Sequence, residues 1–213
     1  DLVSSRGLGD VYKRQTRLFR RFQMHLPSGM FMGESSRRMV WIDLEMTGLN
    51  IQTESIIEIA TVITDSELNI LAQGPNLAIK VPDELLTGMD EWNTEHHHQS
   101  GLVERIKTEG VTIDEAEQQT LDFLRQWIEP NTAPLCGNSV WNDRRFLDKE
   151  MPHVADFLHY RMVDVSTVKE LAKRWYPEVA RYRKKLSHQA LDDILESIEE
   201  LRYFRNEIFI QPS

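Results

Sequence analysis

The sequence predicts a single α/β domain in which a mixed sheet is flanked by helices. Three observations lead to this fold class. At 213 residues the chain is long enough for one α/β domain with a full core. Residues 39–80 contain three segments of alternating or β-branched residues, separated by turn residues. From residue 91 onward the apolar residues recur mainly at helical spacing, with one short strand segment among them.

The first strand is predicted within residues 39–49, MVWIDLEMTGL, because apolar residues alternate there with Trp41, Asp43 and Glu45. A period of two places Asp43 and Glu45 on one face, roughly 6–7 Å apart at about 3.3 Å per residue. A buried carboxylate is costly unless a cation or strong hydrogen bonds compensate it, and oxygen ligands suit Mg²⁺ and Mn²⁺. The two acids therefore indicate a hard-cation site. The alternative is a half-exposed edge strand with two solvated acids.

Two more strands are expected directly after the first. Residues 55–64 are rich in β-branched side chains, and residues 69–80 follow after a turn. Because the connections between these strands are so short, the three strands predict an antiparallel meander.

Five helices and one further strand complete the predicted order. Thr112 and Glu115 match a capping box at the start of the second helix. The further strand is expected within residues 133–140, between the second and the third helix. The predicted helices span residues 91–107, 112–128, 142–151, 164–175 and 187–206.

The composition argues against several classes of protein. No apolar run approaches the roughly 18 residues that span a bilayer, so a membrane protein is not expected. The single cysteine, Cys136, offers neither an internal disulfide nor a thiolate zinc cluster, which fits a reducing compartment. Residues 39–213 carry 17 Lys or Arg against 31 Asp or Glu, a net charge of −14. So acidic a segment is a poor candidate for tracking along a long polyanion, and any contact with nucleic acid is expected to be short and local.

Residues 1–38 are interpreted as a leader that precedes the folded domain at 39–213. They lack a hydrophobic period and carry eight Lys or Arg against three Asp or Glu. Residues 1–15 resemble translated vector or adapter sequence, and the acid-free, Arg-rich residues 11–33 have the composition of a mitochondrial transit peptide. We therefore expect the leader to be disordered, and to be either partly non-native or a targeting segment.

Two later segments place further titratable residues at predicted helix starts. Asp143 lies at a strand-to-helix junction, where an acid would also complement the helix dipole. In SHQALDD, residues 187–193, His188 and Asp192 are four apart and share a helix face, whereas Asp193 is rotated further round. Taken separately, a dipole-complementing Asp and a structural His remain alternatives.

Taken together, the titratable residues follow the order of a known family. An Asp-x-Glu pair on the first strand, an Asp opening a middle helix and a His-x4-Asp near the C-terminus resemble the DEDDh 3′→5′ exonucleases, which have an RNase H-like fold. The resemblance extends to the oligoribonuclease family, the small-RNA exonucleases of bacteria and mitochondria, and it covers residues 39–210. The segments that carry it include WIDLEMTGL (41–49), GNS (137–139), DRRFLDKEMP (143–152), HYRMVDVSTVKELAKRW (159–175) and HQALDDI (188–194).

The resemblance implies the roles of the titratable residues. Two Mg²⁺ or Mn²⁺ ions would be held by Asp43, Glu45, Asp143 and Asp193. His188 would act as the general base, since the ordinary pKa of a histidine side chain lies near neutral pH. The spacing of the family selects Asp193, although Asp192 is the acid that shares a helix face with His188.

The resemblance also implies contacts with the substrate. Leu49 corresponds to a wedge between two bases, Trp92 to the base pocket and His97 to a histidine near the 3′ end. The cap over the 5′ phosphate corresponds to Ser139, Arg161, Ser166 and Thr167. Tyr160 corresponds to a tyrosine that reaches the site from a second protomer, and this implies a homodimer.

Some of these residues have other interpretations. Leu49 and Trp92 would also suit a hydrophobic core. His96–His98 resemble a zinc cluster, although three adjacent histidines on a helix cannot all face one ion. Trp141 departs from the small or polar residue common in the family, and beside Asp143 it would alter packing or access.

We therefore expect a dimeric, metal-dependent 3′→5′ exoribonuclease of the mitochondrion and/or the cytoplasm. It would degrade very short RNA, down to dinucleotides, to nucleoside 5′-monophosphates. The basic residues concentrated in 173–185 would attract a small polyanion to one point. One alternative is a processive nuclease for longer RNA or DNA, which needs a continuous basic groove. Others are a non-catalytic RNase H-like module that binds short nucleotides or a protein, and a retaining glycosidase, whose paired carboxylates would leave Asp143 and His188 unexplained.

Overall fold

The computed structural model describes residues 37–179, 182 and 189–209. The interpretation of 1–38 as a leader falls almost entirely outside these residues. His188 and residues 180–181 and 183–185 of the basic segment 173–185 also lie outside them.

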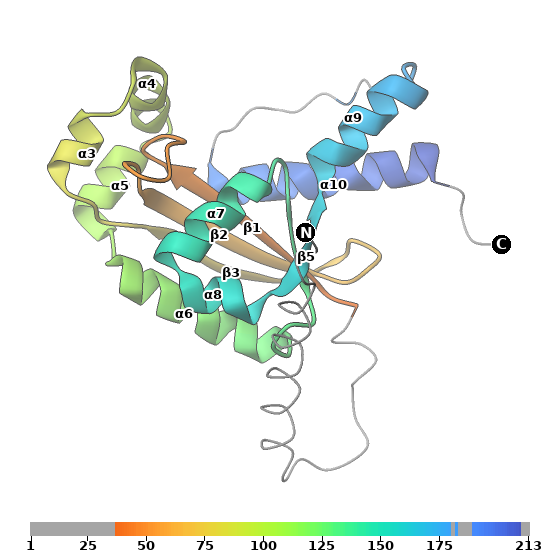
Figure 1. Ribbon diagram of the computed structural model, residues 1–213, viewed down its shortest axis with the longest axis horizontal. Coiled ribbons are helices and arrows are strands. Elements are labelled where there is room, and N and C mark those ends of the chain that lie inside the picture. The colour runs from red at the N-terminus through yellow and green to blue at the C-terminus, as the bar shows by residue number, and fades with distance from the viewer. Residues whose placement is uncertain (1–36, 180–181, 183–188, 210–213) are drawn as a thin grey trace, which may run out of the picture. The chain divides into compact units, whose positions relative to one another are not determined.

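A five-stranded mixed sheet forms the centre of the described structure (Figure 1), and its strands lie in the order β3-β2-β1-β4-β5. The strands are β1 (Met39–Met46), β2 (Ile56–Thr64), β3 (Ile70–Ala78), β4 (Pro134–Gly137) and β5 (His159–Asp164). The first three pair antiparallel, which confirms the predicted meander, whereas β4 and β5 join them in parallel. β1 is flanked by β2 and β4, so the alternative of an edge strand is wrong.

Helices cover both faces of this sheet (Figure 1). Val40, Ile42 and Leu44 of β1 belong to a buried cluster with residues of α6, α7 and α8. Trp41 points to the opposite face, in a second buried cluster with residues of α10. The helices are α3 (Asp83–Thr87), α4 (Glu91–Gln99), α5 (Leu102–Glu109), α6 (Ile113–Trp127), α7 (Trp141–Glu150), α8 (Pro152–Phe157), α9 (Val165–Trp175) and α10 (Ala190–Ile208). Asp43 and Glu45 follow Trp41 by two and four residues, so their side chains lie on the same face of β1 as Trp41 and point toward α10.

The predicted helix over residues 91–107 is wrong as a single helix, because α4 ends at Gln99 and α5 begins at Leu102. Gly101 separates them with a φ of 77°, a left-handed conformation that interrupts a right-handed helix and that glycine adopts without strain. The short elements α3, α8 and β5 were not predicted. Helices of five and six residues are too short to reveal a helical period, and β5 is an edge strand in which no side chain is fully buried.

Two further observations concern the composition. Cys136 is fully buried on β4, and burial raises the pKa of its thiol above the ordinary range, so it packs as an apolar residue. Among the described helices, none combines the length and the apolar character needed to cross a bilayer.

Candidate active site

Three carboxylates converge where β1 faces α10. Asp43 and Glu45 of β1 and Asp193 of α10 present ligand oxygens that all lie within 4.8 Å of one another. Within the part of the chain that the structure describes, this is the one group of at least three such side chains with that spacing. Asp192 does not belong to this group, so the shared helix face with His188, which suggested Asp192 as the metal ligand, was the wrong criterion. Ligands that converge from a strand and a helix need not share one helix face.

Asp143, the fourth predicted acid, lies in the first turn of α7 and is 7% exposed. Its Oδ1 accepts a hydrogen bond from the backbone N–H of Leu44 at 3.0 Å, which ties the start of α7 to β1 between the two acids of that strand. The charge of Asp143 raises the pKa of Glu45. The side chain therefore lies near the cluster and is more than a complement to the helix dipole.

The four acids repel one another in a poorly solvated place. Burial, followed in importance by the charges of Glu58, Asp193 and Asp143, raises the pKa of Glu45 to about 8. Burial likewise raises the pKa of Asp143 to about 7, although its hydrogen bond from Leu44 lowers it. Clustered carboxylates whose ionised forms are so disfavoured gain most from a divalent cation, and their oxygens are the ligands that such cations prefer. The residues present thus fit a divalent metal.

These pKa shifts predict a pH-dependent response to metal. Between the ordinary pKa of Glu45, 4.5, and its raised value of about 8, the folded protein binds a proton that the unfolded chain has released. The metal-free fold therefore loses stability as the pH rises through this window. A cation has to displace this proton, so we expect Mg²⁺ to raise the melting temperature more at about pH 8.5 than at about pH 6.

Thermal melts in EDTA and in Mg²⁺ at both pH values check this expectation. In Glu45→Gln the amide cannot titrate, and the difference between the two pH values should shrink. A Mg²⁺ response that is larger at the lower pH would contradict the raised pKa of Glu45.

A buried ion pair supports the cluster from the neighbouring strand. Glu58 of β2 lies opposite Glu45 in the antiparallel register, and its side chain is 2% exposed. It forms an ion pair with Arg105 of α5, which also bonds Glu109 at 2.8 Å. The other carboxylate oxygen of Glu58 accepts the backbone N–H of Ala190, the first residue of α10, at 3.5 Å. The pair therefore fixes α5 and the start of α10 to β2.

Removal of Arg105 is expected to destabilise the protein strongly. Arg105→Ala would leave the Glu58 carboxylate buried without its counter-charge, at a cost of about 3–5 kcal/mol in the free energy of unfolding. Urea denaturation measures this loss. Arg125→Ala is the matched control, because its pair with Asp122 is solvated and is expected to contribute less than about 1 kcal/mol. Equal losses in the two variants would contradict a desolvated Glu58.

Leu49 and Trp92 are both 65% exposed, so the alternative that they are core residues is wrong. Leu49 lies in the connection between β1 and β2, and Trp92 in the first turn of α4. The Trp92 ring stacks on His96, with ring centroids 4.6 Å apart and an interplanar angle of 11°. Exposed apolar side chains of this kind are available for contact with a base.

His97 is buried, and its Nε2 lies 3.1 Å from the backbone oxygen of Met46. A carbonyl only accepts, so Nε2 carries the proton and Nδ1 faces Glu45, whose Oε2 lies 4.0 Å away. Burial lowers the pKa of His97 and favours this neutral form. His98 is exposed and His96 stacks on Trp92, so the three side chains diverge and the alternative of a zinc cluster is wrong.

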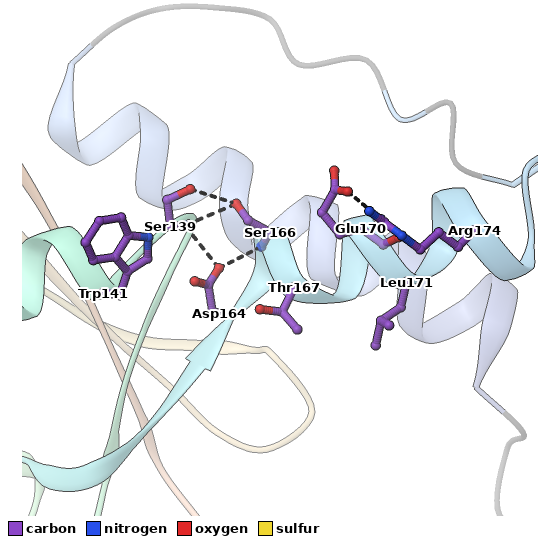
Figure 2. Close-up of a pocket in the computed structure, with 8 residues that line it drawn as sticks. All are labelled: Ser139, Trp141, Asp164, Ser166, Thr167, Glu170, Leu171 and Arg174. Atoms are coloured by element: carbon purple, nitrogen blue, oxygen red, sulfur yellow. Dashed lines mark hydrogen bonds and ion pairs between the residues drawn. The ribbon is translucent and has the colours of Figure 1, made fainter.

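A pocket of about 390 Å³ lies between the loop after β4 and the start of α9, and it is lined by three of the predicted phosphate contacts (Figure 2). These are Ser139, Ser166 and Thr167. Ser139 has a left-handed φ of 51°, and its backbone N–H donates to Oδ1 of Asp164 at 3.0 Å and to Oγ of Ser166 at 3.1 Å. The structure thus brings these side chains together on one polar surface.

The two other predicted residues of this region lie elsewhere. Arg161 does not line the pocket, and its Nε donates to the hydroxyl of Tyr160 at 3.2 Å. Tyr160 is 66% exposed on β5, at the edge of the sheet. Trp141 lines the pocket beside Ser139, and the guanidinium carbon of Arg145 lies 5.5 Å from its ring centre. The expected influence of Trp141 on access therefore concerns this pocket.

Sequence reasoning missed several residues that shape the site. Glu58 carried a usable signal, because it is an acid inside the apolar strand segment IIEIA, just as Asp43 and Glu45 are acids inside the apolar strand β1. Arg105, Asn138 and Asp164 gave none, since their partners lie far away in the sequence.

Comparison with known proteins places the chain in a family. A family model described as "Exonuclease" matches residues 40–201. The mitochondrial oligoribonuclease of Mus musculus is 57% identical over 185 residues, which cover 85% of this chain and 78% of that protein. The oligoribonuclease of Acinetobacter baylyi is 54% identical over 175 residues, which cover 82% and 96%. The chain belongs to the oligoribonuclease family.

Solved structures show the fold of this oligoribonuclease family member at lower identity. Exonuclease I of E. coli, in complex with a 5cy-dT13 oligonucleotide, has a TM-score of 0.62 and 14% identity. The match covers 80% of this chain but 41% of that one, and exonuclease I of Methylocaldum szegediense gives a TM-score of 0.56 with similar coverage. The predicted family and fold class are confirmed.

Proposed function

We propose that this protein is a 3′→5′ exoribonuclease that degrades short oligoribonucleotides, especially dinucleotides, to nucleoside 5′-monophosphates. The observation that carries the proposal is the cluster of Asp43, Glu45 and Asp193, in a chain 57% identical to a mitochondrial oligoribonuclease. The exposed Leu49 and Trp92 supply apolar contacts for bases.

The chemistry that two bound divalent ions supply is positive charge at the attacking water and at the leaving 3′ oxygen. Mg²⁺ or Mn²⁺ would be held by Asp43, Glu45, Asp143 and Asp193. The hydrogen bond from Leu44 to Asp143 keeps one acid aligned beside β1 before any ion arrives. The proton of the attacking water passes to the imidazole of His188, which lies outside the described residues and is assigned from its family spacing.

Two features of the described residues support a preference for short substrates, namely a small phosphate pocket and the limited free positive charge beside it. The pocket lined by Ser139, Ser166 and Thr167 would receive the 5′ phosphate. Lys173 and Arg174, the described members of the basic segment that lie on α9, both pair with Glu170, at 2.7 and 2.5 Å. Glu170 offsets part of their charge, which favours a short phosphate contact over the continuous basic groove that a processive nuclease requires.

We also propose that the protein acts as a homodimer in which Tyr160 reaches the active site of the partner subunit. β5 is an edge strand, and edge strands present unpaired backbone groups to a partner. Tyr160 and Met162 of β5 are 66% and 41% exposed, and Trp175 of the adjoining α9 is 66% exposed. A location in the mitochondrion and/or the cytoplasm is proposed from the mitochondrial relatives.

Hydrolysis of a 5′-phosphorylated diribonucleotide and of an RNA of about 20 nucleotides, each in Mg²⁺ and in EDTA, tests the proposed activity. We expect fast, Mg²⁺-dependent turnover of the dinucleotide and much slower turnover of the longer RNA. Comparable efficiency on both lengths would contradict the preference for short substrates. Tight binding of the dinucleotide without turnover would instead identify a non-catalytic binding module.

A further inference from the structure

We propose that Asn138 is a positioning residue that aligns the phosphate pocket and the metal-binding turn of α10 through one partly buried hydrogen-bond chain. The proposal rests on the proposed function, which makes the pocket a phosphate site and Asp193 a metal ligand. Asn138 lies in the loop between β4 and α7, and it belongs neither to the residues that line the pocket nor to the acidic cluster.

On the pocket side, the direction of each hydrogen bond can be assigned. Ser166 Oγ donates its single proton to Oδ1 of Asn138 at 2.9 Å. Its lone pairs therefore accept the backbone N–H of Ser139 at 3.1 Å and the hydroxyl of Ser139 at 3.2 Å. These bonds hold Ser139 in its left-handed conformation at the pocket wall (Figure 2). Asn138 thus determines how the two hydroxyls are oriented.

On the α10 side, the amide of Asn138 acts as a donor. Its Nδ2 donates to Oγ of Ser197 at 2.8 Å and to Oε2 of Glu200 at 3.1 Å. Since Oγ of Ser197 accepts this hydrogen bond, its own hydroxyl proton is free to donate, and it bonds the backbone oxygen of Asp193 at 2.7 Å. The chain therefore ends on the turn that presents Asp193 to the acidic cluster.

The burial of these partners explains why an amide is required. Ser197 is 3% exposed, and Glu200 is fully buried with an ion pair of 2.8 Å to Lys169 of α9. An amide offers an acceptor at one end and two donors at the other, as Ser166, Ser197 and Glu200 require. An Asp side chain at position 138 would have the same shape but would place a second carboxylate against Glu200 and remove both donors.

Asn138→Asp tests the proposal, with Asn131→Asp in the exposed loop before β4 as a matched control for the change of charge. We measure kcat/KM on a diribonucleotide with and without its 5′ phosphate, and the Mn²⁺ concentration at the midpoint of the thermal shift. We expect the preference for the 5′ phosphate to fall about tenfold and the Mn²⁺ midpoint to rise about tenfold, the scale on which the supporting partners of metal ligands act. The control should change neither value.

Ser197→Ala separates the two ends of the chain and serves also if Asn138→Asp does not fold. It removes the bond to Asp193 while leaving the bond between Ser166 and Asn138. We expect a raised Mn²⁺ midpoint with the preference for the 5′ phosphate within about twofold of the starting protein. A folded Asn138→Asp variant with unchanged preference and unchanged midpoint would overturn the proposal, as would a Ser197→Ala variant with an unchanged midpoint. A starting protein that hydrolyses neither dinucleotide would overturn the proposed function alone, because the Mn²⁺ midpoints do not depend on turnover.

Discussion

Replacing Asp193 with Asn is expected to abolish hydrolysis of the dinucleotide while leaving the metal-free fold at least as stable. The substitution keeps the shape of the side chain but removes a charge from the cluster of Asp43, Glu45 and Asp193. Loss of one hydrogen-bond donor to a transition-state oxyanion typically lowers kcat by about 10²–10³-fold, and loss of a metal ligand is expected to reach at least the upper end of that range. The remaining carboxylates repel less, because the charge of Asp193 is one of the causes of the raised pKa of Glu45.

Two measurements on each variant test this prediction, namely the turnover rate and the melting temperature in Mn²⁺ and in EDTA. Turnover of the 5′-phosphorylated dinucleotide should disappear, and the rise in melting temperature caused by Mn²⁺ should shrink, whereas the melt in EDTA should be unchanged or higher. Asp192→Asn is the matched control, since it removes the same charge from the adjacent residue, which lies outside the cluster. If Asp192→Asn lost activity and Asp193→Asn retained it, the assignment of the metal ligand would be reversed.

Mixing two inactive variants is expected to restore activity if Tyr160 acts across a dimer. Tyr160→Ala retains the acidic cluster but lacks the tyrosine, and Asp193→Asn retains the tyrosine but lacks a metal ligand. In a mixed dimer, the intact cluster of one protomer would receive Tyr160 of the partner subunit. Random exchange at equal concentrations makes half of the dimers mixed with one working site each, so about a quarter of the original activity should return.

The control for this experiment is Tyr176→Ala, which removes a tyrosine exposed just after α9 and should retain activity by itself. Sedimentation of each variant establishes that subunits still associate and exchange. Two outcomes would contradict a role for Tyr160 in the partner's site. One is full activity of Tyr160→Ala, and the other is no recovery in a mixture shown to contain mixed dimers.

Much of the site could be predicted because several of its residues stand in local sequence patterns that indicate which face or which helix end they occupy. The alternation in β1 was enough to place Asp43 and Glu45 on one face, and the burial of both strand faces explains why acids there are unusual. The strand-to-helix junction before Asp143 was visible in the same way. By contrast, the face of α10 suggested Asp192, and only the spacing of the oligoribonuclease family indicated Asp193.

The sequence by itself determined the family, the meander of the first three strands and the identities of four acids. The tertiary structure decided which of those acids meet, that β1 lies inside the sheet, and that Glu58, Arg105 and Asn138 support the site. The physical reason is that periodicity along a segment fixes which residues share a face, whereas the partner of that face depends on packing between distant elements. Glu58 and Ala190 lie 132 residues apart, and Asn138 and Ser197 lie 59 apart. Hydrogen bonds between residues so far apart in the sequence form only when the sheet and its helices have assembled, so they cannot be predicted from a local sequence pattern.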